Sequence, residues 1–322
     1  MNILITSAGK RVSLVRSFQK ELKKIMPSAK VFAADANPEL AAACHIADAS
    51  LKVPRLDHPS YIAELINLCK FNEITLVIPT IDTELLLLAK NTMFMKEQGV
   101  TPLIAALEII EKCRDKRKIH SFFAQHHIDV AREFSKDDYQ LPLFIKPTDG
   151  SRSQDTYIIK NPNDLTDYHF KNEKLMFLTY LDPDDYDEYT CDLYYGKDHF
   201  LKCVVPRKRI EVRDGEVNKG KTVNNELVPY IKERLGNVKG AVGCFTAQFF
   251  KHRKENQIIG IEINPRFGGG FPLSYLAGAN FPKWIIEEYL LKKVISPQFD
   301  CWESDLLMLR YDDEILVHGY KG

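Results

Sequence analysis

The first hundred residues alternate between short β-prone apolar runs and longer stretches with helical spacing. The apolar runs lie at 3–6, 31–34 and 75–78. Between them, apolar residues recur near every third or fourth position, first at Val12, Leu14, Val15, Phe18, Leu22 and Ile25, and then at Tyr61, Leu65, Ile66 and Leu68. Strands that alternate with helices are typical of a parallel sheet covered on both faces. Residues 1 to about 110 are therefore predicted to form a doubly wound, Rossmann-like domain.

Ligands of such a sheet bind beyond the carboxyl ends of its strands, which places the turns after the first strands at the functional edge. These turns hold Gly9, Lys10, Arg11, Asp35 and Asp82. A dinucleotide fingerprint needs Gly-x-Gly-x-x-Gly in the first turn. Here Gly9 stands alone before the bulky Lys10 and Arg11, so a dinucleotide-dependent oxidoreductase is a less favoured alternative.

The rest of the chain mixes helices with antiparallel strands. The charged stretch 111–118 is predicted to start a helix, and the β-prone run 143–145 leads directly into Lys146 and Pro147. Strand patterns then fill 189–213, 247–250 and 258–263, with a helix at about 226–235. Asp214 and Gly215 separate two strand-like runs, as is typical of a hairpin turn. This half is predicted to be an α+β unit.

One segment matches a phosphate-binding pattern but lies in the wrong context. Residues 215–222 read Gly-Glu-Val-Asn-Lys-Gly-Lys-Thr, which fits Gly-x-x-x-x-Gly-Lys-Thr. That pattern binds phosphates only where a buried parallel strand ends and a helix begins. Gly215 instead completes the hairpin turn and Glu216 resumes a strand, so we interpret the match as coincidental.

Composition and charge exclude several classes of protein. The 322 residues are 45% hydrophobic and 27% charged, which excludes a disordered tail, a collagen-like fibre and a coiled-coil rod. The 44 Lys and Arg residues balance 44 Asp and Glu residues, so no overall positive charge attracts nucleic acid or an anionic membrane.

No apolar run is long enough for a membrane span and the first residues do not resemble a signal peptide, so we expect a cytoplasmic protein. Scattered cysteines without a Cys-x-x-Cys pair, and the lack of a His-Glu-x-x-His motif, argue for reduced thiols and against a zinc site.

Separated segments supply the side chains that chemistry with a nucleoside triphosphate requires. Such chemistry needs cations for the phosphates, a loop to cover them, an acid for the ribose and oxygen ligands for magnesium. The chain offers Lys116, Lys146, the loop 149–153, Glu188, Gln248, Glu262, Asn264 and Arg266.

The segment from Glu262 to Asn264 predicts a metal site from strand geometry. Residues two apart in a strand point to the same side, so these two side chains share one face while Ile261 and Ile263 face the other. Gln248 on the preceding strand is close enough in a hairpin to add a third oxygen. Three oxygen donors suit magnesium, which completes its shell with water and phosphate oxygens. The alternative is a polar, solvent-facing edge strand.

Taken in order, these segments resemble the motifs of the ATP-grasp superfamily, most closely its carbamoyl-phosphate-synthase-like branch of carboxylate-amine ligases. The similar segments are Asp115-Lys116, Ile145-Lys146-Pro147 with Gly150-Ser151-Arg152-Ser153, Glu188-Tyr189-Thr190 with Asp192, Arg207-Lys208-Arg209, Gln248, and Glu262-Ile263-Asn264-Pro265-Arg266. The segments 6–9 and 79–84, together with Asp35, are similar to the N-terminal domain of that branch, so the resemblance covers nearly the whole chain.

The resemblance implies how ATP would be bound. Lys116 and Lys146 would bind the α- and β-phosphates. The loop 149–155 would be the flap over the triphosphate, with Gly150, Ser151 and Ser153 as its contacting residues. Tyr180 and Leu181 match the hinge whose backbone reads adenine, and Glu188 matches the acid on the ribose.

The resemblance also implies the metal and catalytic groups. Gln248, Glu262 and Asn264 match the ligands of Mg²⁺ (or Mn²⁺). Arg266 matches the arginine that steadies the transferring phosphoryl group, so Arg266 and Lys146 are catalytic candidates.

Arg207 and Arg209 are the other two catalytic candidates. They belong to a set that alternates along one predicted strand and would therefore face one way, where its cations could bind a carboxylate substrate. The set is Arg207, Arg209, Glu211 and Arg213. An exposed charged strand face is an equally good interpretation of Arg213. Gly268, Gly269 and Gly270 would either approach a ligand closely or form a flexible turn.

Two positions depart from the family pattern. Asp155 stands where the flap usually ends in Gly, and Thr179 stands where the hinge usually has an acid. An anion that points into the flap would weaken its contact with phosphate. The change in the hinge matters less, because backbone groups read the adenine.

The sequence thus predicts a pre-ATP-grasp domain at 1–110 and an ATP-grasp domain at 111–322, with a mobile lid subdomain at about 118–178 and an antiparallel-sheet subdomain at about 179–300. The predicted activity is ATP- and magnesium-dependent ligation, in which a small-molecule carboxylate is activated as an acyl phosphate and attacked by an amine or similar nucleophile. The alternative is a non-catalytic ATP-binding regulatory protein of the same fold. We expect small-molecule substrates as partners, no nucleic acid and no membrane, and leave open whether the chain forms a homodimer.

Overall fold

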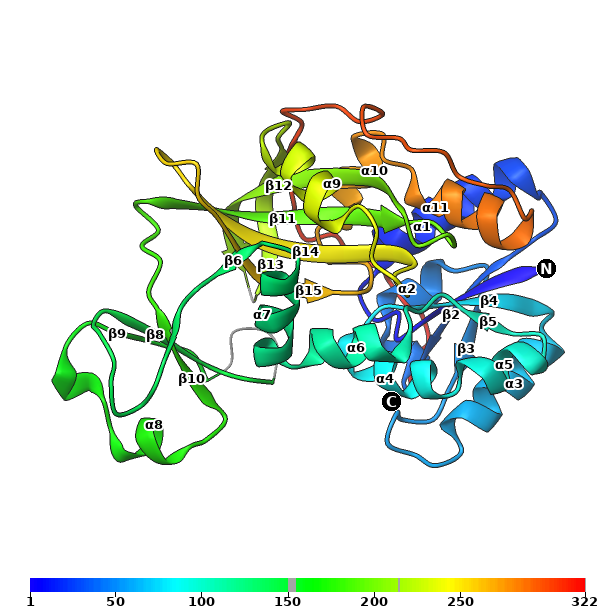
Figure 1. Ribbon diagram of the computed structural model, residues 1–322. Coiled ribbons are helices and arrows are strands. Elements are labelled where there is room, and N and C mark those ends of the chain that lie inside the picture. Colours follow the sequence, from blue (N-terminus) through cyan, green and yellow to red (C-terminus); the bar gives the residue numbers. More distant parts are fainter. Residues whose placement is uncertain (150–154, 214, 322) are drawn as a thin grey trace.

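The computed structural model describes residues 1–149, 155–213 and 215–321, and its strands form three separate sheets (Figure 1). The first sheet is parallel and has the strand order β3-β2-β1-β4-β5. Its strands are β1 (Asn2–Thr6), β2 (Val31–Asp35), β3 (Ala49–Lys52), β4 (Ile74–Pro79) and β5 (Thr101–Pro102). Its helices are α1 (Val12–Ile25), α2 (Ala42–Ile46), α3 (Tyr61–Phe71), α4 (Asp82–Lys90) and α5 (Thr92–Glu97).

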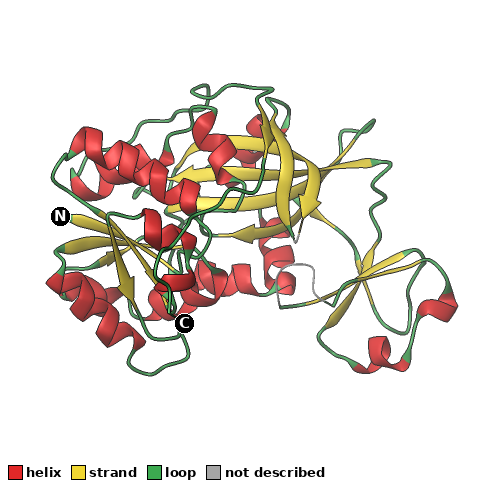
Figure 2. Ribbon diagram, turned by 180° about the vertical axis from the view of Figure 1, so that it is seen from behind, coloured by secondary structure: helices red, strands yellow, loops and turns green. Residues whose placement is uncertain are grey.

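Helices cover both faces of this sheet (Figure 2). Along β1, Ile3 and Ile5 pack in one core with α1, and Leu4 packs in another core with α3. Every second residue of a strand points to the same face, so both faces of a doubly wound sheet are apolar. The predicted doubly wound domain is confirmed.

Helices α6 (Leu107–Arg114) and α7 (Lys116–Gln125) connect this sheet to the rest of the chain. The predicted helix start across 111–118 is wrong, because Asp115 ends one helix and begins the next. Its carboxylate accepts hydrogen bonds from the backbone N–H groups of Arg117 (2.9 Å) and Lys118 (3.2 Å), which caps α7. Lys116 is thereby fixed at the first position of α7.

The second sheet is antiparallel and has the order β7-β10-β8-β9. Its strands are β7 (Glu133–Phe134), β8 (Leu143–Pro147), β9 (Tyr157–Ile159) and β10 (Leu175–Thr179), with α8 (Asp167–Lys171) before the last strand. This unit stands apart from the other two sheets in Figure 1 and has a small core of its own. Most of helix α7 lies within the predicted lid range of about 118–178, and this helix packs on the third sheet through Phe122 and Phe123.

The third sheet has seven strands in the order β16-β13-β12-β11-β14-β15-β6, all antiparallel except for the pair β15 and β6. The strands are β6 (Asp129–Val130), β11 (Tyr186–Tyr195), β12 (Leu201–Arg213), β13 (Glu216–Thr222), β14 (Gly243–His252), β15 (Ile258–Asn264) and β16 (Leu307–Leu309). The accompanying helices are α9 (Leu227–Leu235), α10 (Phe271–Leu276) and α11 (Phe281–Ile285). An N-terminal parallel sheet followed by antiparallel sheets matches the predicted fold class.

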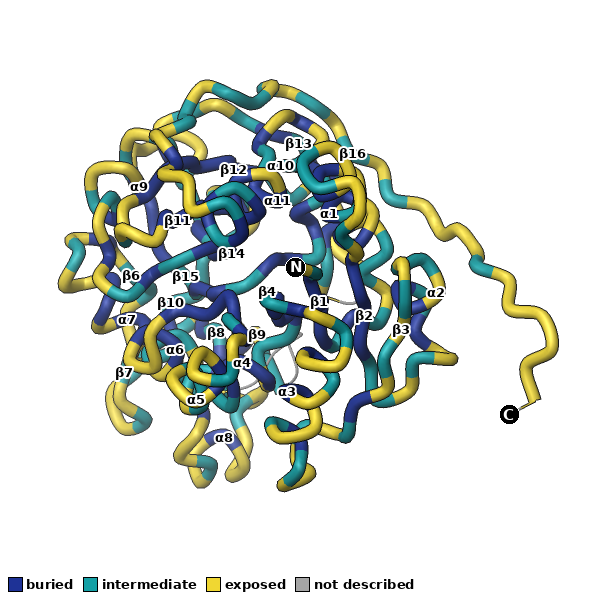
Figure 3. Tube along the Cα trace, turned by 90° about the vertical axis from the view of Figure 1, so that its right-hand side faces the viewer, coloured by how far each residue is buried: buried dark blue, intermediate teal, exposed yellow. Residues whose placement is uncertain are grey.

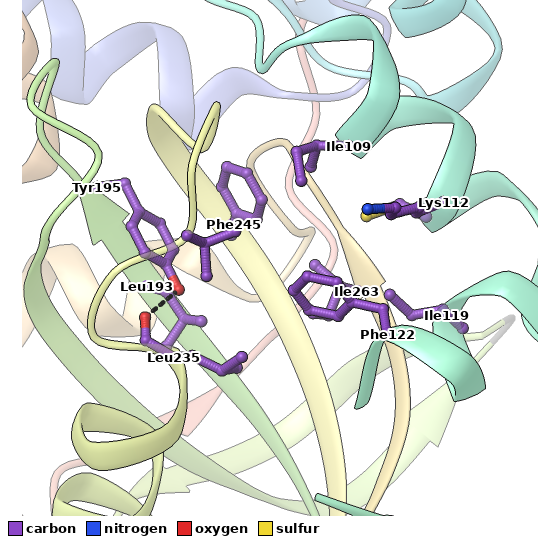
Figure 4. A pocket seen from close by; sticks show the side chains of 11 residues that line it. Ile109, Lys112, Ile119, Phe122, Leu193, Tyr195, Leu235, Phe245 and Ile263 are labelled. Carbon is purple, nitrogen blue, oxygen red and sulfur yellow. Dashed lines mark hydrogen bonds between the residues drawn. The ribbon is translucent and has the colours of Figure 1, made fainter. Parts of the chain in front are cut away.

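The two faces of the third sheet bury different partners. One face packs with α6, α7 and α9 and encloses a cavity of about 10 Å³. Phe122 and Phe245 are among the side chains that line it (Figure 4). That volume holds no more than about one water molecule. On the other face the sheet shares a core with α1 of the first domain, where Phe18 meets Phe267 edge to face at 5.8 Å. The open part of this second face carries the candidate site.

The segment after β16 is largely exposed and extends away from the body of the molecule (Figure 3). Within the described residues, no helix has the length and apolar character needed to cross a membrane.

Close packing of α7 on β15 gives a stability prediction. A Cβ atom at Gly260 would lie 2.8 Å from the ring of the fully buried Phe123. We expect Gly260→Ala to lower the free energy of unfolding by about 1–3 kcal/mol through overpacking. Phe123→Leu in the same chain relieves the clash, so the double variant should lose less than the sum of the two single variants in urea unfolding. Additive losses would contradict this packing.

Candidate functional site

A cleft of about 790 Å³ opens between the three sheets. Its walls come from the turns after β1 and β4, from α6, from Lys116 at the start of α7, from β8 of the second sheet, and from the open face of the third sheet. A volume of this size is typical of sites for small molecules.

The floor of the cleft is a row of polar side chains on neighbouring strands. The pairing register sets Thr190 of β11 opposite Arg207 of β12 and Gln248 of β14, and sets Gln248 opposite Glu262 of β15. Residues directly opposite each other in a sheet point to the same face. The four side chains therefore form one continuous line across the floor, and all four line the cleft.

A second row lies two residues further along the strands and holds the first in place. It contains Asp192, Thr246 and Asn264. The fully buried Asp192 carboxylate accepts two hydrogen bonds from Arg207, at 2.8 and 3.0 Å, and one from Ser274 Oγ at 2.6 Å. Arg207 is 1% exposed, and this bidentate pair fixes its orientation.

A third row brings Glu188 and Arg209 together. Arg209 Nη1 lies 3.0 Å from Glu188 Oε1 and donates to Gln248 Oε1 at 3.2 Å. Burial raises the pKa of Glu188, with Glu262 acting in the same direction and Arg209 acting against it. Glu188 is thus a half-buried acid at the edge of the cleft, next to Phe250, which also lines the cleft.

The three predicted metal ligands converge. Gln248 Nε2 and Asn264 Nδ2 donate to the same oxygen of Glu262, at 2.8 and 2.9 Å. The set offers one carboxylate and two amide oxygens, which fits a magnesium ion that keeps water and phosphate oxygens. Among the described residues, no group of three or more His, Cys, Asp or Glu could hold a metal.

Lys146 faces this floor from β8 of the second sheet. Its side chain is buried, and it makes no hydrogen bond or ion pair with any residue that the structure describes. Burial lowers the pKa of Lys146 to about 8, with Lys116 acting in the same direction and Glu262 against it. A buried ammonium group without a counter-ion is costly unless a bound anion compensates it.

His120 lies one turn after Lys116 on α7 and is a buried neighbour of both lysines. Burial, Lys146 and Lys116 together lower the pKa of His120 to about 4. The imidazole is therefore neutral near pH 7 and adds no further charge beside the lysines. His120 was not predicted from the sequence as a site residue.

Arg266 joins the floor to the first domain. Its Nη2 lies 2.7 Å from Asp82 Oδ2, at the start of α4, and its buried Nε has no hydrogen-bond partner among the described residues. Thr246 Oγ1 donates to the carbonyl oxygen of Arg266 at 2.9 Å, which fixes the backbone at this point. The ion pair spans 184 positions of sequence, so spacing gave no signal for it.

The glycine segment after Arg266 is packed against side chains. A Cβ atom at Gly268 would lie 3.0 Å from Thr246, and one at Gly269 would lie 2.7 Å from the Glu216 carboxyl group. A Cβ atom at Gly270 would overlap Arg207 Nη1. The three glycines therefore permit close approach to the floor of the cleft, which argues against a flexible turn.

Most of the predicted site residues meet in the cleft. Those that line it are Lys116, Lys146, Glu188, Arg207, Arg209, Gln248, Glu262, Asn264 and Arg266. Tyr180 and Leu181 follow β10 and are not among the lining residues, so their role as the adenine hinge stays a prediction. Gly150, Ser151 and Ser153 lie outside the described residues.

Two details of strand geometry were predicted wrongly, both because β-bulges interrupt the alternation. The register shifts between Gln248 and Phe249, and Ile261 lines the cleft with Glu262 although the opposite face was expected. On β12 the register shifts around Glu211, so Val212 lines the cleft, whereas Arg213 pairs with Asp312 at 2.6 Å. Arg207, Arg209, Glu211 and Arg213 therefore do not face one way.

Some residues of the cleft were not assigned a role from sequence. Arg11, Phe144 and Phe250 line it, and Phe144 lies two residues before Lys146 on the same face of β8. Alternation along β8 was the signal that could have found Phe144. Asp35, by contrast, accepts hydrogen bonds from the backbone N–H groups of Gly9 (3.2 Å) and Asn37 (3.1 Å), so it closes its own turns.

Asp155 adopts a conformation that explains why glycine is usual there. Its φ of 54° lies in the left-handed region that favours glycine. Its carboxylate accepts hydrogen bonds from Tyr157 (2.7 Å) and Tyr168 (2.8 Å), and these bonds lower the pKa of Asp155. The anion is thus held by two tyrosines of the second sheet unit.

The phosphate-binding pattern at 215–222 lies in an antiparallel hairpin, as predicted. Residues Glu216–Thr222 form β13, which pairs with β12 and with β16. Lys221 points to Asp305 (2.8 Å) and does not line the cleft.

Two family models match the chain. Residues 3–103 match the model described as PylC-like, N-terminal domain, and residues 171–305 match the model described as ATP-grasp in the biosynthetic pathway with Ter operon. The second model covers much of the third sheet, and the fold as a whole is that of an ATP-grasp enzyme family. The chain belongs to the ATP-grasp superfamily, with a PylC-like N-terminal domain. No curated protein matches its sequence.

Solved structures share the fold at low identity. The biotin carboxylase domain of Hydrogenobacter thermophilus 2-oxoglutarate carboxylase, solved with MgADP, ADP and bicarbonate, is 14% identical over 95% of this chain and 73% of that chain, with a TM-score of 0.72. L-amino acid ligase from Bacillus licheniformis is 16% identical over 92% of this chain and 75% of that chain, with a TM-score of 0.67. Pyruvate carboxylase from Rhizobium etli is 13% identical over 87% of this chain, with a TM-score of 0.65. The matched region is only 27% of the length of that carboxylase.

Lys221 tests the interpretation of the hairpin. Replacing it by Ala removes an exposed ion pair worth about 0–1 kcal/mol and touches no part of the cleft. We expect Lys221→Ala to change the Kd for MgATP, measured by calorimetry, by less than about twofold. A loss of several hundredfold would show that the pattern at 215–222 does bind phosphate.

Replacing Lys146 by an apolar residue should have opposite effects on stability and on nucleotide binding. Because the buried ammonium has no counter-ion in the ligand-free protein, Lys146→Met should raise the free energy of unfolding at pH 7 by about 1–3 kcal/mol. The same variant should lose nucleotide binding. Lys171→Met on the exposed surface of α8 is the control and should change stability by less than about 0.5 kcal/mol.

The pH dependence of this effect has a defined direction. The folded-state pKa of about 8 lies below the ordinary value of 10.5, so between these values the unfolded chain binds more protons and wild-type stability rises relative to the variant. The advantage of Lys146→Met should be full below pH 8 and shrink towards pH 10.5 in denaturant titrations. A constant difference across this window would contradict the burial of a charged Lys146.

Proposed function

We propose that the protein is an ATP- and magnesium-dependent ligase that activates a small-molecule carboxylate as an acyl phosphate for attack by an amine or similar nucleophile. The observation that carries this proposal is the buried Lys146, which has no counter-ion among the described residues and faces Glu262 across the cleft. A polyanionic nucleotide between them would compensate the lysine, while a divalent cation would compensate the glutamate.

The residues of the cleft divide into roles for such a reaction. Lys116 and Lys146 would bind the α- and β-phosphates, and Glu188 would accept a hydrogen bond from a ribose hydroxyl. Phe144 and Phe250 offer apolar surface near Lys146 and Glu188. We keep Tyr180 and Leu181 as the proposed adenine hinge.

Gln248, Glu262 and Asn264 would hold Mg²⁺ or Mn²⁺. When bound, the metal supplies charge neutralisation to the phosphates. The protein supplies one carboxylate and two amides, so phosphate and water oxygens would have to complete the coordination shell.

The chemistry begins with a carboxylate, which is a poor electrophile because attack would add charge to an anion. A carboxylate oxygen attacks the γ-phosphorus of ATP, the bond to the β,γ-bridging oxygen breaks, and ADP leaves. The nucleophile then attacks the carbonyl carbon of the acyl phosphate, the bond from that carbon to the phosphate oxygen breaks, and inorganic phosphate leaves while the nucleophile gives up a proton to water. Arg266, held by Asp82, and Arg207, held by Asp192, would stabilise the charge that develops on the phosphoryl group and the carboxylate. Arg209 would act at the same carboxylate or on the phosphate tail.

A pair of matched substitutions tests this proposal. Glu262→Gln removes the charge of the metal site with little change in shape, and we expect kcat for magnesium-dependent ADP formation to fall about 100-fold or more. Glu255→Gln, on the exposed turn between β14 and β15, is the control and should keep full activity. ADP and phosphate release are measured across a panel of amino acids and dicarboxylates.

The outcomes separate the competing functions. Failure of MgATP to raise the Tm of the wild-type protein would overturn the proposal. Stabilisation by MgATP without ADP release for any member of the panel would favour the regulatory protein. Stabilisation by a nicotinamide cofactor, with ATP inert, would favour an oxidoreductase.

A further inference from the structure

One part of the cleft is built by the first domain and the glycine segment instead of by the second sheet. Its side chains are Arg11 after β1, Asp82 at the start of α4, Glu216 of β13 and Arg266, and Gly268, Gly269 and Gly270 border it. We call this part the arginine end. No role in binding ATP is proposed for Arg11 or Glu216.

The backbone that carries Arg11 is held from several sides. The Arg11 N–H group donates to the carbonyl oxygen of Ala8 at 2.8 Å, and the N–H group of Ala43 donates to that of Gly9 at 2.9 Å. Thr80 Oγ1 donates to the carbonyl oxygen of Ser7 at 2.8 Å. The turn is therefore fixed by β4 and α2, and it presents the Arg11 side chain at a set position in the cleft.

The guanidinium group of Arg11 has no fixed partner. It makes no hydrogen bond and no ion pair with any of the described residues, although it is half-buried. Burial and the neighbouring Arg266 lower its pKa, but an arginine keeps its proton at any pH of interest. Arg11 is thus a permanent, partly desolvated cation that faces the cleft.

The acids nearby are already paired with other arginines. Asp82 pairs with Arg266 at 2.7 Å, and Glu216 pairs with Arg310 at 3.1 Å. Asp192 is bound in bidentate fashion by Arg207 at 2.8 and 3.0 Å. Each of these three carboxylates thus has a cationic partner at ion-pair distance, and Glu216 has a second one in Lys10 at 3.6 Å, whereas Arg11 has no such partner among the described residues.

The paired groups have little freedom to rearrange around Arg11. Gly269 packs closely on the Glu216 carboxyl group, and Gly270 packs on Arg207. Arg310 is also held by the carbonyl oxygen of Val217 at 3.2 Å. An anion that enters the cleft therefore meets Arg11 unpaired, while the neighbouring arginines are already held by carboxylates.

We propose that Arg11 binds a second anionic group of the acceptor substrate, a carboxylate or a phosphate, while the carboxylate that is activated lies nearer to Glu262. The proposal rests on the ligase function proposed above and narrows its substrate to small molecules with at least two anionic groups. A planar guanidinium group recognises either anion through two parallel hydrogen bonds. Arg11 would set substrate specificity and would take no part in phosphoryl transfer.

The test compares Arg11→Ala and Arg11→Lys with Arg16→Ala, a control on the exposed face of helix α1, which begins directly after Arg11. ADP release is measured with monocarboxylates, with dicarboxylates such as succinate and L-glutamate, and with the phosphorylated carboxylate 3-phosphoglycerate. We expect turnover only with the dicarboxylates or with the phosphorylated carboxylate. Whichever of these two is the better substrate identifies the second anion as a carboxylate or a phosphate. Arg11→Ala should raise KM for the best compound about 10- to 100-fold, Arg11→Lys less, and Arg16→Ala not at all, since a hydrogen-bonded charge contributes binding energy of this order.

Two binding measurements separate this proposal from the ligase proposal. The Kd for MgATP should stay within about twofold in Arg11→Ala, which also shows that the variant is folded. Stabilisation of the wild-type protein by a compound with two anions, lost in Arg11→Ala, would support the anion site even if no ADP formed. The inference is overturned if monocarboxylates are used as efficiently as these compounds, if Arg11→Ala leaves KM unchanged, or if no compound with two anions binds while MgATP does.

Discussion

The buried ion pair between Arg207 and Asp192 is the interaction on which the cleft depends. Transfer of two charges into a sheet interior is expensive, so this pair adds little net stability, while its bidentate geometry fixes the orientation of Arg207. Asp192 also accepts a hydrogen bond from Ser274 of α10, and Thr246 lies 3.4 Å from it. Asp192 thus aligns Arg207, and the neighbouring Thr246 holds the backbone of Arg266 by donating to its carbonyl oxygen. The glycine segment follows the same constraint, because a side chain at Gly270 would displace Arg207.

Around this fixed pair, the cleft contains cations that are only partly compensated. The chain has no net charge, so its attraction for a polyanion cannot be a property of the whole molecule. It arises instead from groups such as the buried Lys146 and the half-buried Arg11, whose charged side chains have no hydrogen-bond partner among the described residues. In a partly dry cleft these charges act on a ligand more strongly than the same residues would on the surface. The stability lost by burying them is recovered only when an anion binds.

Strand alternation was sufficient to predict the floor of the cleft, because Glu262, Asn264 and Gln248 lie on regular parts of two neighbouring strands. It failed at Ile261 and Val212, where β-bulges shift the register and nothing in the local sequence distinguishes a bulge from a continuous strand. The break at Asp115 was also missed, although Asp is a common helix N-cap. The pair between Arg266 and Asp82 could not be predicted from spacing, since it depends on how the first domain packs against the third sheet.

That packing makes the first domain part of the site. Phe18 of α1 meets Phe267, the residue that follows Arg266, within a core that includes both units. The apolar contact positions the turns after β1 and β4, which deliver Arg11 and Asp82 to the cleft. Apolar burial is non-directional, but once α1 is packed against the third sheet, polar groups at its N-terminal end such as Arg11 have little freedom to move. The contact between Phe18 and Phe267 stabilises the first domain against the third sheet. It therefore also fixes the position of the charged Arg11, at the end of the cleft where we expect the acceptor substrate. An exchange of the first domain between members of this fold would change which acceptor is recognised while the floor that we assign to ATP stayed the same.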